Sequence, residues 1–270
     1  MPGFTPLSAD TIRARIANTA AGAFVREVVY YPQTGSTNDA CRELAEAGAP
    51  EGTLVVADEQ LEGRGRMGRR WVTPAGGALL LSLLFRPPLD ASQASQLTMV
   101  CGLAAAEAVE TCTGLRPGLK WPNDLLLGDE KLAGILSELG LTGERLDYVI
   151  VGLGLNANFD PRAVEGAGPQ ATSLQRALGR PVDRLALLAA LLDRAAVHYA
   201  ALRAGDAPLD AWRARLVTLG RRVTVGEPGR RYDGTAESTD ADGALIVRLD
   251  DGTRVTVHAG DVTLRPEGLP

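Results

Sequence analysis

Cysteine and histidine are scarce in this chain of 270 residues. It contains three cysteines, Cys41, Cys101 and Cys112, and two histidines, His198 and His258. An odd number of cysteines without the spacing of metal ligands excludes a disulfide framework and a zinc ribbon. Two isolated histidines leave little material for a Ser-His-Asp triad or a polyhistidine metal site. We therefore expect reduced thiols, a cytoplasmic protein, and chemistry that rests on other side chains.

An excess of positive charge is also missing. The chain has 28 lysines and arginines against 33 acidic residues, which gives a net charge of −5, and 45% of its residues are hydrophobic. This composition excludes disorder along the whole chain and requires any nucleic acid or anionic membrane to bind at a local basic patch. We find no apolar run of about 18 residues, and residues 1–10 lack the features of a secretory signal, so we expect no membrane span.

Hydrophobic spacing predicts a mixed α/β core. Short apolar runs bounded by Gly, Pro or Asp predict strands at 54–57, 78–85, 125–127, 131–138 and 148–155, several of them antiparallel. Helical spacing predicts helices from a Ser92 cap to Gly114, from a Ser36–Asp39 capping box to Gly48, and over 184–203 and 209–219. The Gly- and Pro-containing stretch 158–179 is predicted to be a surface loop.

The hydrophobic pattern of the sequence changes at Gly220. Short alternating strands separated by turn signals follow, which predicts a small β-barrel over 220–270 next to a catalytic domain over 1–219. Seven arginines against nine acidic residues give this segment a charge of −2. That charge argues against an oligonucleotide-binding barrel.

The most unusual stretch is 60–71, where three glycines alternate with four arginines and one glutamate, for a local charge of +3. Glycines let the backbone approach a ligand closely, and guanidinium groups match the geometry of carboxylates and phosphates. The stretch therefore predicts an anion site. Its composition alone leaves open a mobile surface loop or an RNA-binding glycine-arginine segment.

Two further segments combine polar residues with apolar strands. The run 120–124 reads Lys-Trp-Pro-Asn-Asp, and a predicted hairpin over 125–138 brings Lys131 close to Asp124. A carboxylate and an amide beside a lysine suit Mg²⁺ and polyphosphate, although a tight turn and an edge-strand lysine fit the same residues. Gly152 and Gly154 precede Asn156 at a strand end, which indicates a β-bulge or a place where a ligand meets the backbone.

Taken together and in this order, the segments resemble the class I biotin–protein ligases. The resemblance rests on GSTN at 35–38, GRGRMGRRW at 63–71, KWPND at 120–124, KLAGIL-x-E at 131–138 and the glycine-rich strand ending in Asn156. It implies a mixed-sheet, class II synthetase-like α/β (α+β) catalytic domain and an SH3-like C-terminal barrel. Met67 departs from the pattern, because many members carry another arginine there. Only 35 residues precede Ser36, so we expect the monofunctional form without a DNA-binding domain.

The resemblance also implies the activity. Such enzymes join biotin to ATP, giving biotinyl-5′-adenylate and pyrophosphate, and then pass the biotinyl group to one lysine of a biotin carboxyl carrier protein. A homodimer is left open, and neither DNA nor a membrane is an expected partner. The alternatives are a lipoyl or octanoyl ligase of related fold, and a non-enzymatic ligand sensor or RNA-binding protein that uses the arginine-glycine segment.

By the same resemblance, roles fall on individual residues. The expected catalytic residues are Lys131, Arg64 and Arg66. The expected biotin-binding residues are Ser36, Thr37, Asn38, Gln60, Gly63, Arg64, Gly65, Arg66, Lys131 and Gly134. The expected ATP-binding residues are Arg66, Arg69, Trp71, Lys120, Asn123, Asp124, Lys131 and Asn156. Asp124 is the expected ligand of Mg²⁺, and ATP and biotin are the expected substrates.

Overall fold

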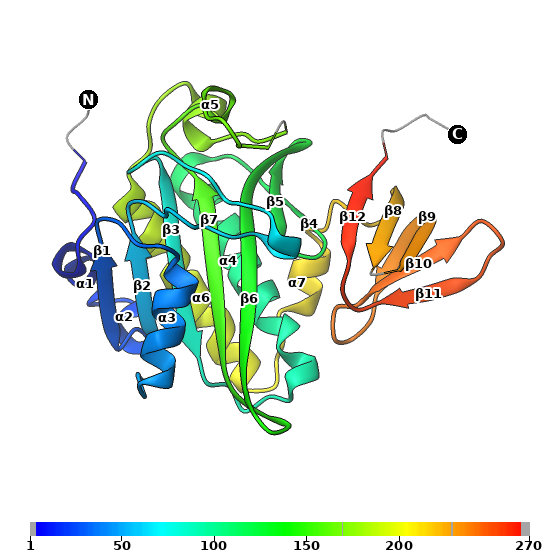
Figure 1. Ribbon diagram of the computed structural model, residues 1–270, viewed down its shortest axis with the longest axis horizontal. Helices are drawn as coiled ribbons and strands as arrows, with labels where there is room; N and C mark the ends of the chain where they lie inside the picture. Colours follow the sequence, from blue (N-terminus) through cyan, green and yellow to red (C-terminus); the bar gives the residue numbers. More distant parts are fainter. Residues whose placement is uncertain (1–3, 169, 228, 266–270) are drawn as a thin grey trace.

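The structure is a computed structural model that describes residues 4–168, 170–227 and 229–265. Its larger part is built on a seven-stranded sheet in the order β1-β2-β3-β7-β6-β5-β4 (Figure 1). The strands are β1 (Glu27–Tyr31), β2 (Thr53–Ala57), β3 (Ala78–Phe85), β4 (Gly118–Lys120), β5 (Asp124–Leu127), β6 (Glu130–Thr142) and β7 (Arg145–Asn156). β1 and β2 run parallel and the other neighbours pair antiparallel, so the predicted mixed sheet is confirmed.

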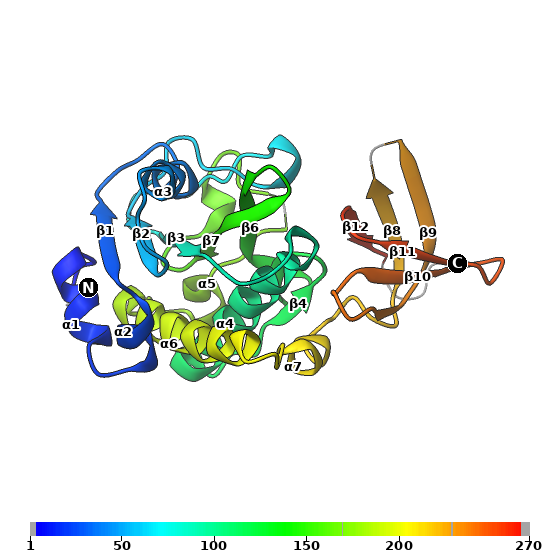
Figure 2. The same ribbon diagram turned by 90° about the horizontal axis from the view of Figure 1, so that it is seen from below.

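Helices cover both faces of this sheet. α4 (Ser95–Thr113) and α6 (Arg184–Arg203) pack on one face, and α3 (Thr37–Glu46) packs on the other, as Figure 2 shows. The shorter helices are α1 (Ala9–Ile16), α2 (Ala20–Phe24), α5 (Leu174–Leu178) and α7 (Leu209–Arg213). Because both faces are covered, the central strand β3 reads as an almost continuous apolar run.

Alternate residues of strand β3 pack on opposite faces of the sheet. Its odd-numbered residues from Leu79 to Phe85 join the core under α4 and α6. The even-numbered residues point the other way: Leu84 packs under α3, Leu80 packs beside Phe159, and Ser82 bonds to α3. This alternation follows from the pleat of a strand. Ser82 is fully buried and is the one polar residue in the run.

The smaller part is a five-stranded antiparallel sheet in the order β11-β10-β9-β8-β12. Its strands are β8 (Arg222–Glu227), β9 (Arg230–Thr239), β10 (Leu245–Leu249), β11 (Arg254–Val257) and β12 (Asp261–Leu264). The first four fall where strands were predicted, and β12 was not predicted. The two parts are joined by a buried contact, in which Trp121 Nε1 donates to the Gly243 carbonyl at 2.9 Å.

Two predicted helix boundaries and one predicted loop were wrong. Ser92 lies inside a short 3₁₀ turn, Ala91–Gln93, whose capping box uses Asp90, and α4 begins afterwards and ends at Gly114 as predicted. The helix predicted over 209–219 stops at Arg213, because the following residues pair with β4 through Leu119. The stretch 158–179 contains a 3₁₀ turn (Pro161–Ala163) and α5 in addition to loop.

The capping box predicted at Ser36 and Asp39 is also absent. Ser36 occupies the N-cap position of α3, but its side chain makes no capping hydrogen bond. The Thr37 N–H donates instead to Gln60 Oε1 at 2.7 Å, and Asp39 pairs with two arginines. A polar side chain brought from a distant loop therefore replaces the local cap.

Helix α6 is, by its length and composition alone, apolar enough to cross a membrane, contrary to the sequence reading. Its leucines at 187, 188, 191 and 192 are buried in the core, and the helix packs against α4, α2 and α1. The apolar character of its buried face is therefore accounted for by packing within this domain.

Candidate active site

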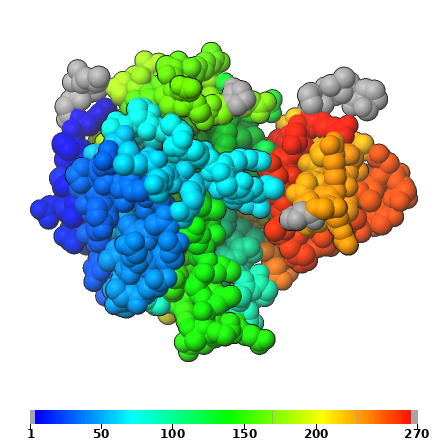
Figure 3. Space-filling view, viewed as in Figure 1, coloured from blue at the N-terminus to red at the C-terminus, as the bar shows by residue number. Residues whose placement is uncertain are grey.

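A cavity of about 780 Å³ opens on the face of the sheet that carries α3. Its walls come from the start of α3, the segment 60–72, the strands β5, β6 and β7, residues 166–168 and 170–171, and the edge strand β12 of the smaller sheet. In the space-filling view the segment that carries the arginines lies against the C-terminal part (Figure 3). An ion pair between Arg69 and Asp261 of β12 joins them.

The floor of the cavity is a trough lined by glycine. In the strand register Ser82, Gly152 and Leu136 form one row, and the next row along the strands places Gly134 beside Gly154. Side chains from above fill the space: a Cβ on Gly152 would overlap the amide of Asn38, and a Cβ on Gly154 would lie 2.6 Å from the indole of Trp71.

The strand register decides whether the glycine-rich strand β7 contains a β-bulge, which was one of the two predicted alternatives. β7 pairs with β3 and β6 without a shift at Gly152 or Gly154, and the shift between β6 and β7 lies at Gly140. The prediction of a bulge at these glycines was wrong. They are required because neighbouring side chains cross the strand at close range.

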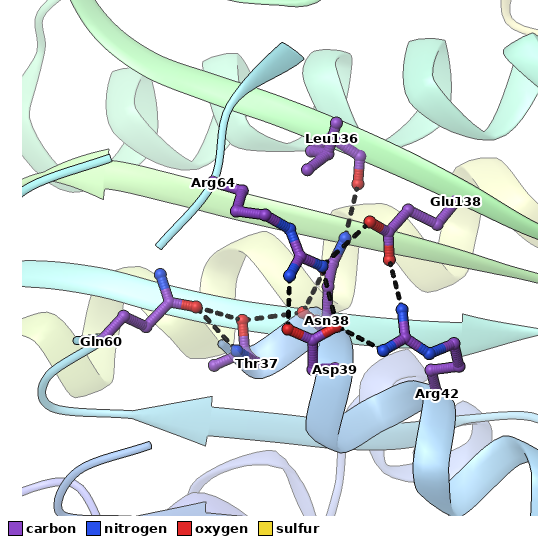
Figure 4. A network of polar contacts seen from close by, with 9 residues as sticks. Thr37, Asn38, Asp39, Arg42, Gln60, Arg64, Leu136 and Glu138 are labelled. Carbon is purple, nitrogen blue, oxygen red and sulfur yellow. Dashed lines mark hydrogen bonds and ion pairs between the residues drawn. The ribbon is translucent and has the colours of Figure 1, made fainter. Parts of the chain in front are cut away.

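A buried polar group closes one end of the trough (Figure 4). Ser82 Oγ lies 2.8 Å from Thr37 Oγ1 and 2.6 Å from Asn38 Oδ1, and Asn38 Nδ2 donates to the Leu136 carbonyl at 3.3 Å. Gln60 Oε1 accepts from both the N–H and the hydroxyl of Thr37. Because an amide that accepts at Oε1 presents its NH₂ on the other side, Gln60 keeps donors for a ligand.

The segment 63–71, which we call the Arg-Gly loop, forms an irregular hairpin. The Trp71 N–H donates to the Gly63 carbonyl at 2.8 Å, and the Gly65 N–H donates to the Arg69 carbonyl at 2.7 Å. Met67 at the tip has a φ of 56°, in the left-handed region, and its side chain is exposed. That conformation costs a non-glycine residue energy, so the loop tip is held in place by the bonds on either side of it.

The arginines of this loop point in different directions. Arg64 binds Asp39 with both Nη atoms, at 2.6 and 2.8 Å. Arg66 approaches Asn123 Oδ1 at 3.4 Å, and its burial lowers the pKa of its guanidinium. Arg69 pairs with Asp261, and hydrogen bonding to that carboxylate raises the pKa of Arg69.

Two lysines stand on the other side of the trough. The hairpin of β5 and β6 places Lys131 Nζ 2.6 Å from Asp124 Oδ1, as predicted, and 5.7 Å from the ring centroid of Trp71. Burial lowers the pKa of Lys120, while the carboxylates of Asp124 and Asp261 act in the opposite direction. The positive charges therefore lie together in this half of the cavity. They lie close to carboxylates, whose place as partners a bound anion would take.

Two residues predicted to contact ATP also bond to the protein itself. Asn123 Nδ2 donates to the Ile135 carbonyl at 2.6 Å, and Asn156 Nδ2 donates to the Thr172 carbonyl at 2.9 Å. The second bond holds the segment 170–172, whose backbone also pairs with Lys131. Both amides hold walls of the cavity in place.

All but one of the predicted site residues line the cavity, and the exception is Gly63. A Cβ on Gly63 would lie 2.5 Å from the Trp71 carbonyl, so this glycine serves the closure of the loop. The sequence reading missed Ser82, although a lone serine in an apolar strand was a usable signal. It also missed Arg221 and Asp261, which reach the cavity from the smaller part, and no local pattern marked them.

Comparisons with known proteins agree with this geometry. Residues 30–156 match the Biotin/lipoate A/B protein ligase family, and residues 218–265 match the biotin protein ligase C terminal domain. The biotin–[acetyl-CoA-carboxylase] ligase of Mycobacterium tuberculosis is 36% identical over 264 residues, which cover 95% of each chain. The chain belongs to the biotin protein ligase family. It is an ATP-dependent ligase, and the fold class expected of such an enzyme is confirmed.

Other members of the family are similar over most of their length. The bifunctional ligase/repressor BirA of Bacillus subtilis is 31% identical over 261 residues, which cover 96% of this chain and 79% of BirA. The biotin protein ligase of Aquifex aeolicus, solved in complex with biotin and ATP, is 28% identical, with a TM-score of 0.74 and coverage of 89% of this chain and 99% of that one.

Proposed function

We propose that this ligase joins biotin to ATP as biotinyl-5′-adenylate, with release of pyrophosphate, and transfers the biotinyl group to a lysine of a biotin carboxyl carrier protein. The observation that carries this proposal is the order of features along one cavity. A buried polar group with free amide donors is followed by a glycine-lined trough and then by a cluster of cations. The head, chain and carboxylate of biotin require these features in that order.

The polar end suits the ureido ring of biotin. The NH₂ of Gln60 is turned toward the ligand because Oε1 is bonded to Thr37, and Ser36 lies beside it on the cavity wall. A ureido ring offers two N–H donors and one carbonyl acceptor, and a ligand without them would leave buried groups unpaired at a cost of about 1–3 kcal/mol each. Gly134 leaves room for the apolar chain.

The cationic end suits the reaction of a carboxylate with the α-phosphate. Two unit charges about 4 Å apart repel by about 4 kcal/mol at an effective dielectric constant of about 20. Arg66 of the Arg-Gly loop and Lys131 of β6 both line the cavity, where they neutralise these anions, and Lys131 stabilises the charge that moves onto the bridging oxygens in the transition state. Arg69 and Lys120 bind the remaining phosphates, and Trp71 stacks on adenine.

Asp124 fits a bound Mg²⁺ in a limited way. The described residues contain no group of three or more His, Cys, Asp or Glu side chains able to hold a metal. Mg²⁺ is commonly bound by one or two carboxylates together with phosphate oxygens. Asp124 supplies one such carboxylate at the cationic end of the cavity, and the ion would help neutralise the phosphates of ATP.

In the second half of the reaction the lysine amine of the carrier attacks the carbonyl carbon of the mixed anhydride. The carbon–oxygen bond to phosphate breaks, AMP leaves, and the amine loses a proton as the amide forms. We place this reaction in the cytoplasm.

The test is a single incubation with biotin, ATP, Mg²⁺ and an unmodified carrier domain. We expect pyrophosphate release that depends on biotin and a carrier whose mass increases by one biotinyl group. Parallel reactions with lipoate and octanoate identify the related ligases. Release with those acids and none with biotin would refute the proposal, and so would a carrier whose mass does not change.

Lys120 gives the nucleotide site a distinct pH dependence. Its pKa is lowered by burial, so the ammonium loses its proton at a lower pH than an exposed lysine does. We expect kcat/KM for ATP to fall as the pH rises and Lys120 loses its proton, since the neutral amine no longer attracts phosphate. The arginine variant Lys120→Arg stays charged and should flatten this fall. Superimposable profiles for the two proteins would contradict this role.

A further inference from the structure

Four charged side chains of alternating sign form a cluster at the rim of the cavity (Figure 4). Asp39 and Arg42 belong to α3, Glu138 belongs to β6, and Arg64 comes from the Arg-Gly loop. Arg64 Nη2 lies 3.3 Å from Glu138 Oε1, in addition to its two bonds with Asp39. Arg42 lies 2.6 Å from Asp39 Oδ1 and 3.9 Å from Glu138 Oε2.

The hydrogen bonds between Arg64 and Asp39 are charge-assisted and bidentate, which makes them strong. A guanidinium that meets a carboxylate with two nitrogens fixes both distance and plane. The side chains of Asp39 and Glu138 are 25% and 28% exposed, so solvent screens them less than a free surface pair. The hydrogen bond from Arg64 is the main reason that the pKa of Asp39 lies below its usual range.

We propose that Asp39 and Glu138 are positioning residues that hold Arg64, and through it the whole Arg-Gly loop, closed over the bound adenylate. This inference rests on the proposed function. The hairpin bonds of the loop link Arg64 to Arg70 across the strands and Gly63 to Trp71, so fixing one arginine fixes the others in place. A closed loop keeps water from the mixed anhydride until the acceptor lysine arrives.

A positioning role for Asp39 and a direct ligand role for Arg64 predict opposite effects of removing the Asp39 carboxylate. If Arg64 bound the biotin carboxylate itself, Asp39 would compete with the ligand, and removing the acid would tighten binding. In the arrangement described here the same change releases the loop and weakens retention of the adenylate. Arg66, which is partly buried and has no carboxylate at bonding distance among the described residues, remains the arginine that faces the ligand.

The experiment measures how fast the purified enzyme–adenylate complex loses its adenylate in the absence of an acceptor. We expect Asp39→Asn and Arg64→Gln each to speed this loss by about threefold to tenfold, the range for a partly exposed bidentate pair. The double variant should be no faster than Arg64→Gln alone, because both changes remove one interaction. Glu138→Gln should have a smaller effect, in line with its longer contact.

Two matched controls separate positioning from general stability. Arg42→Gln removes the other partner of Asp39 without touching the loop. Asp147→Asn makes the same substitution at a similarly half-buried carboxylate, which pairs with Arg145 near the tip of the β6–β7 hairpin and lies away from the Arg-Gly loop. We expect adenylate loss within about twofold of the unmodified enzyme for both. A loss in Arg42→Gln equal to that in Asp39→Asn would overturn the proposal, as would slower loss or additive effects in the double variant.

A second readout does not depend on biotin chemistry. Trypsin cuts after the arginines of the loop, and cleavage requires the loop to open. Without any ligand, Asp39→Asn should be cut in this loop faster than the unmodified protein and Arg42→Gln should not. If pyrophosphate is never released but this difference is seen, the proposed function fails and the positioning role stands. Release of pyrophosphate with no difference in cleavage or retention would refute the positioning role alone.

Discussion

Replacing Lys131 with methionine is expected to slow adenylate formation on the order of 100-fold to 1,000-fold, the cost of removing one preorganised charge from a transition state. Lys131 Nζ stands 2.6 Å from Asp124 and over the Trp71 ring, at the end of the glycine trough. Methionine keeps most of the apolar stem and removes the ammonium. The measurement is pyrophosphate release in a single turnover with saturating biotin and ATP.

The control for this prediction also neutralises the carboxylate that pairs with Lys131. Lys131→Met leaves the carboxylate of Asp124 partly buried without its partner, which by itself disturbs the site. The double variant with Asp124→Asn is neutral at both positions. If the double variant regained most of the rate, Lys131 would serve only to neutralise Asp124. We expect the double variant to stay slower than Asp124→Asn alone, which separates loss of the ammonium from loss of the proposed Mg²⁺ ligand, and biotin binding to change far less than the rate.

Substituting alanine for Gly152 is expected to weaken biotin binding about fivefold to 150-fold, which corresponds to losing about 1–3 kcal/mol of buried hydrogen bonding. The new Cβ would overlap the amide of Asn38, which is held by Ser82 on β3 and by the Leu136 carbonyl on β6. Since those bonds come from the two strands that flank Gly152, Asn38 has no free direction in which to move.

Titration calorimetry with biotin measures this effect. Gly226→Ala is the matched control, because Gly226 also lies in a strand and a Cβ there meets nothing within 4 Å. Asn38→Ala should weaken biotin binding to a similar extent, and adding Gly152→Ala to it should bring little further change. Affinity unchanged in Gly152→Ala would show that the Asn38 group does not shape the biotin site.

The local parts of this architecture could be predicted from the sequence because they depend on neighbours in the chain. The apolar alternation of β3, the hairpin that joins Asp124 to Lys131, and the end of α4 at Gly114 all follow from residues within one or two turns. Helix starts failed where a distant group competed. Gln60 took over the cap of α3, and pairing with Leu119 ended α7 early.

The candidate site divides in the same way. Nearly all of the site residues predicted from the motifs line the cavity, because each motif concentrates unusual residue types within a few positions. Two partners of those residues come from elsewhere in the chain: Ser82 from a buried strand and Asp261 from the second sheet. Contacts between residues that are far apart in sequence leave no local pattern.

The sequence by itself therefore determined the chemical inventory of this ligase: a polar cluster, a glycine-rich strand, a loop of arginines and a lysine opposite a carboxylate. Only the tertiary structure decided which of these groups are free to meet a ligand. It engages Asn38, Asn123 and Asn156 with backbone carbonyls, binds Arg64 to Asp39, and leaves the Gln60 amide facing the cavity. The reason is that a buried polar group must find a partner, and which partner it finds depends on the strands and helices packed around it.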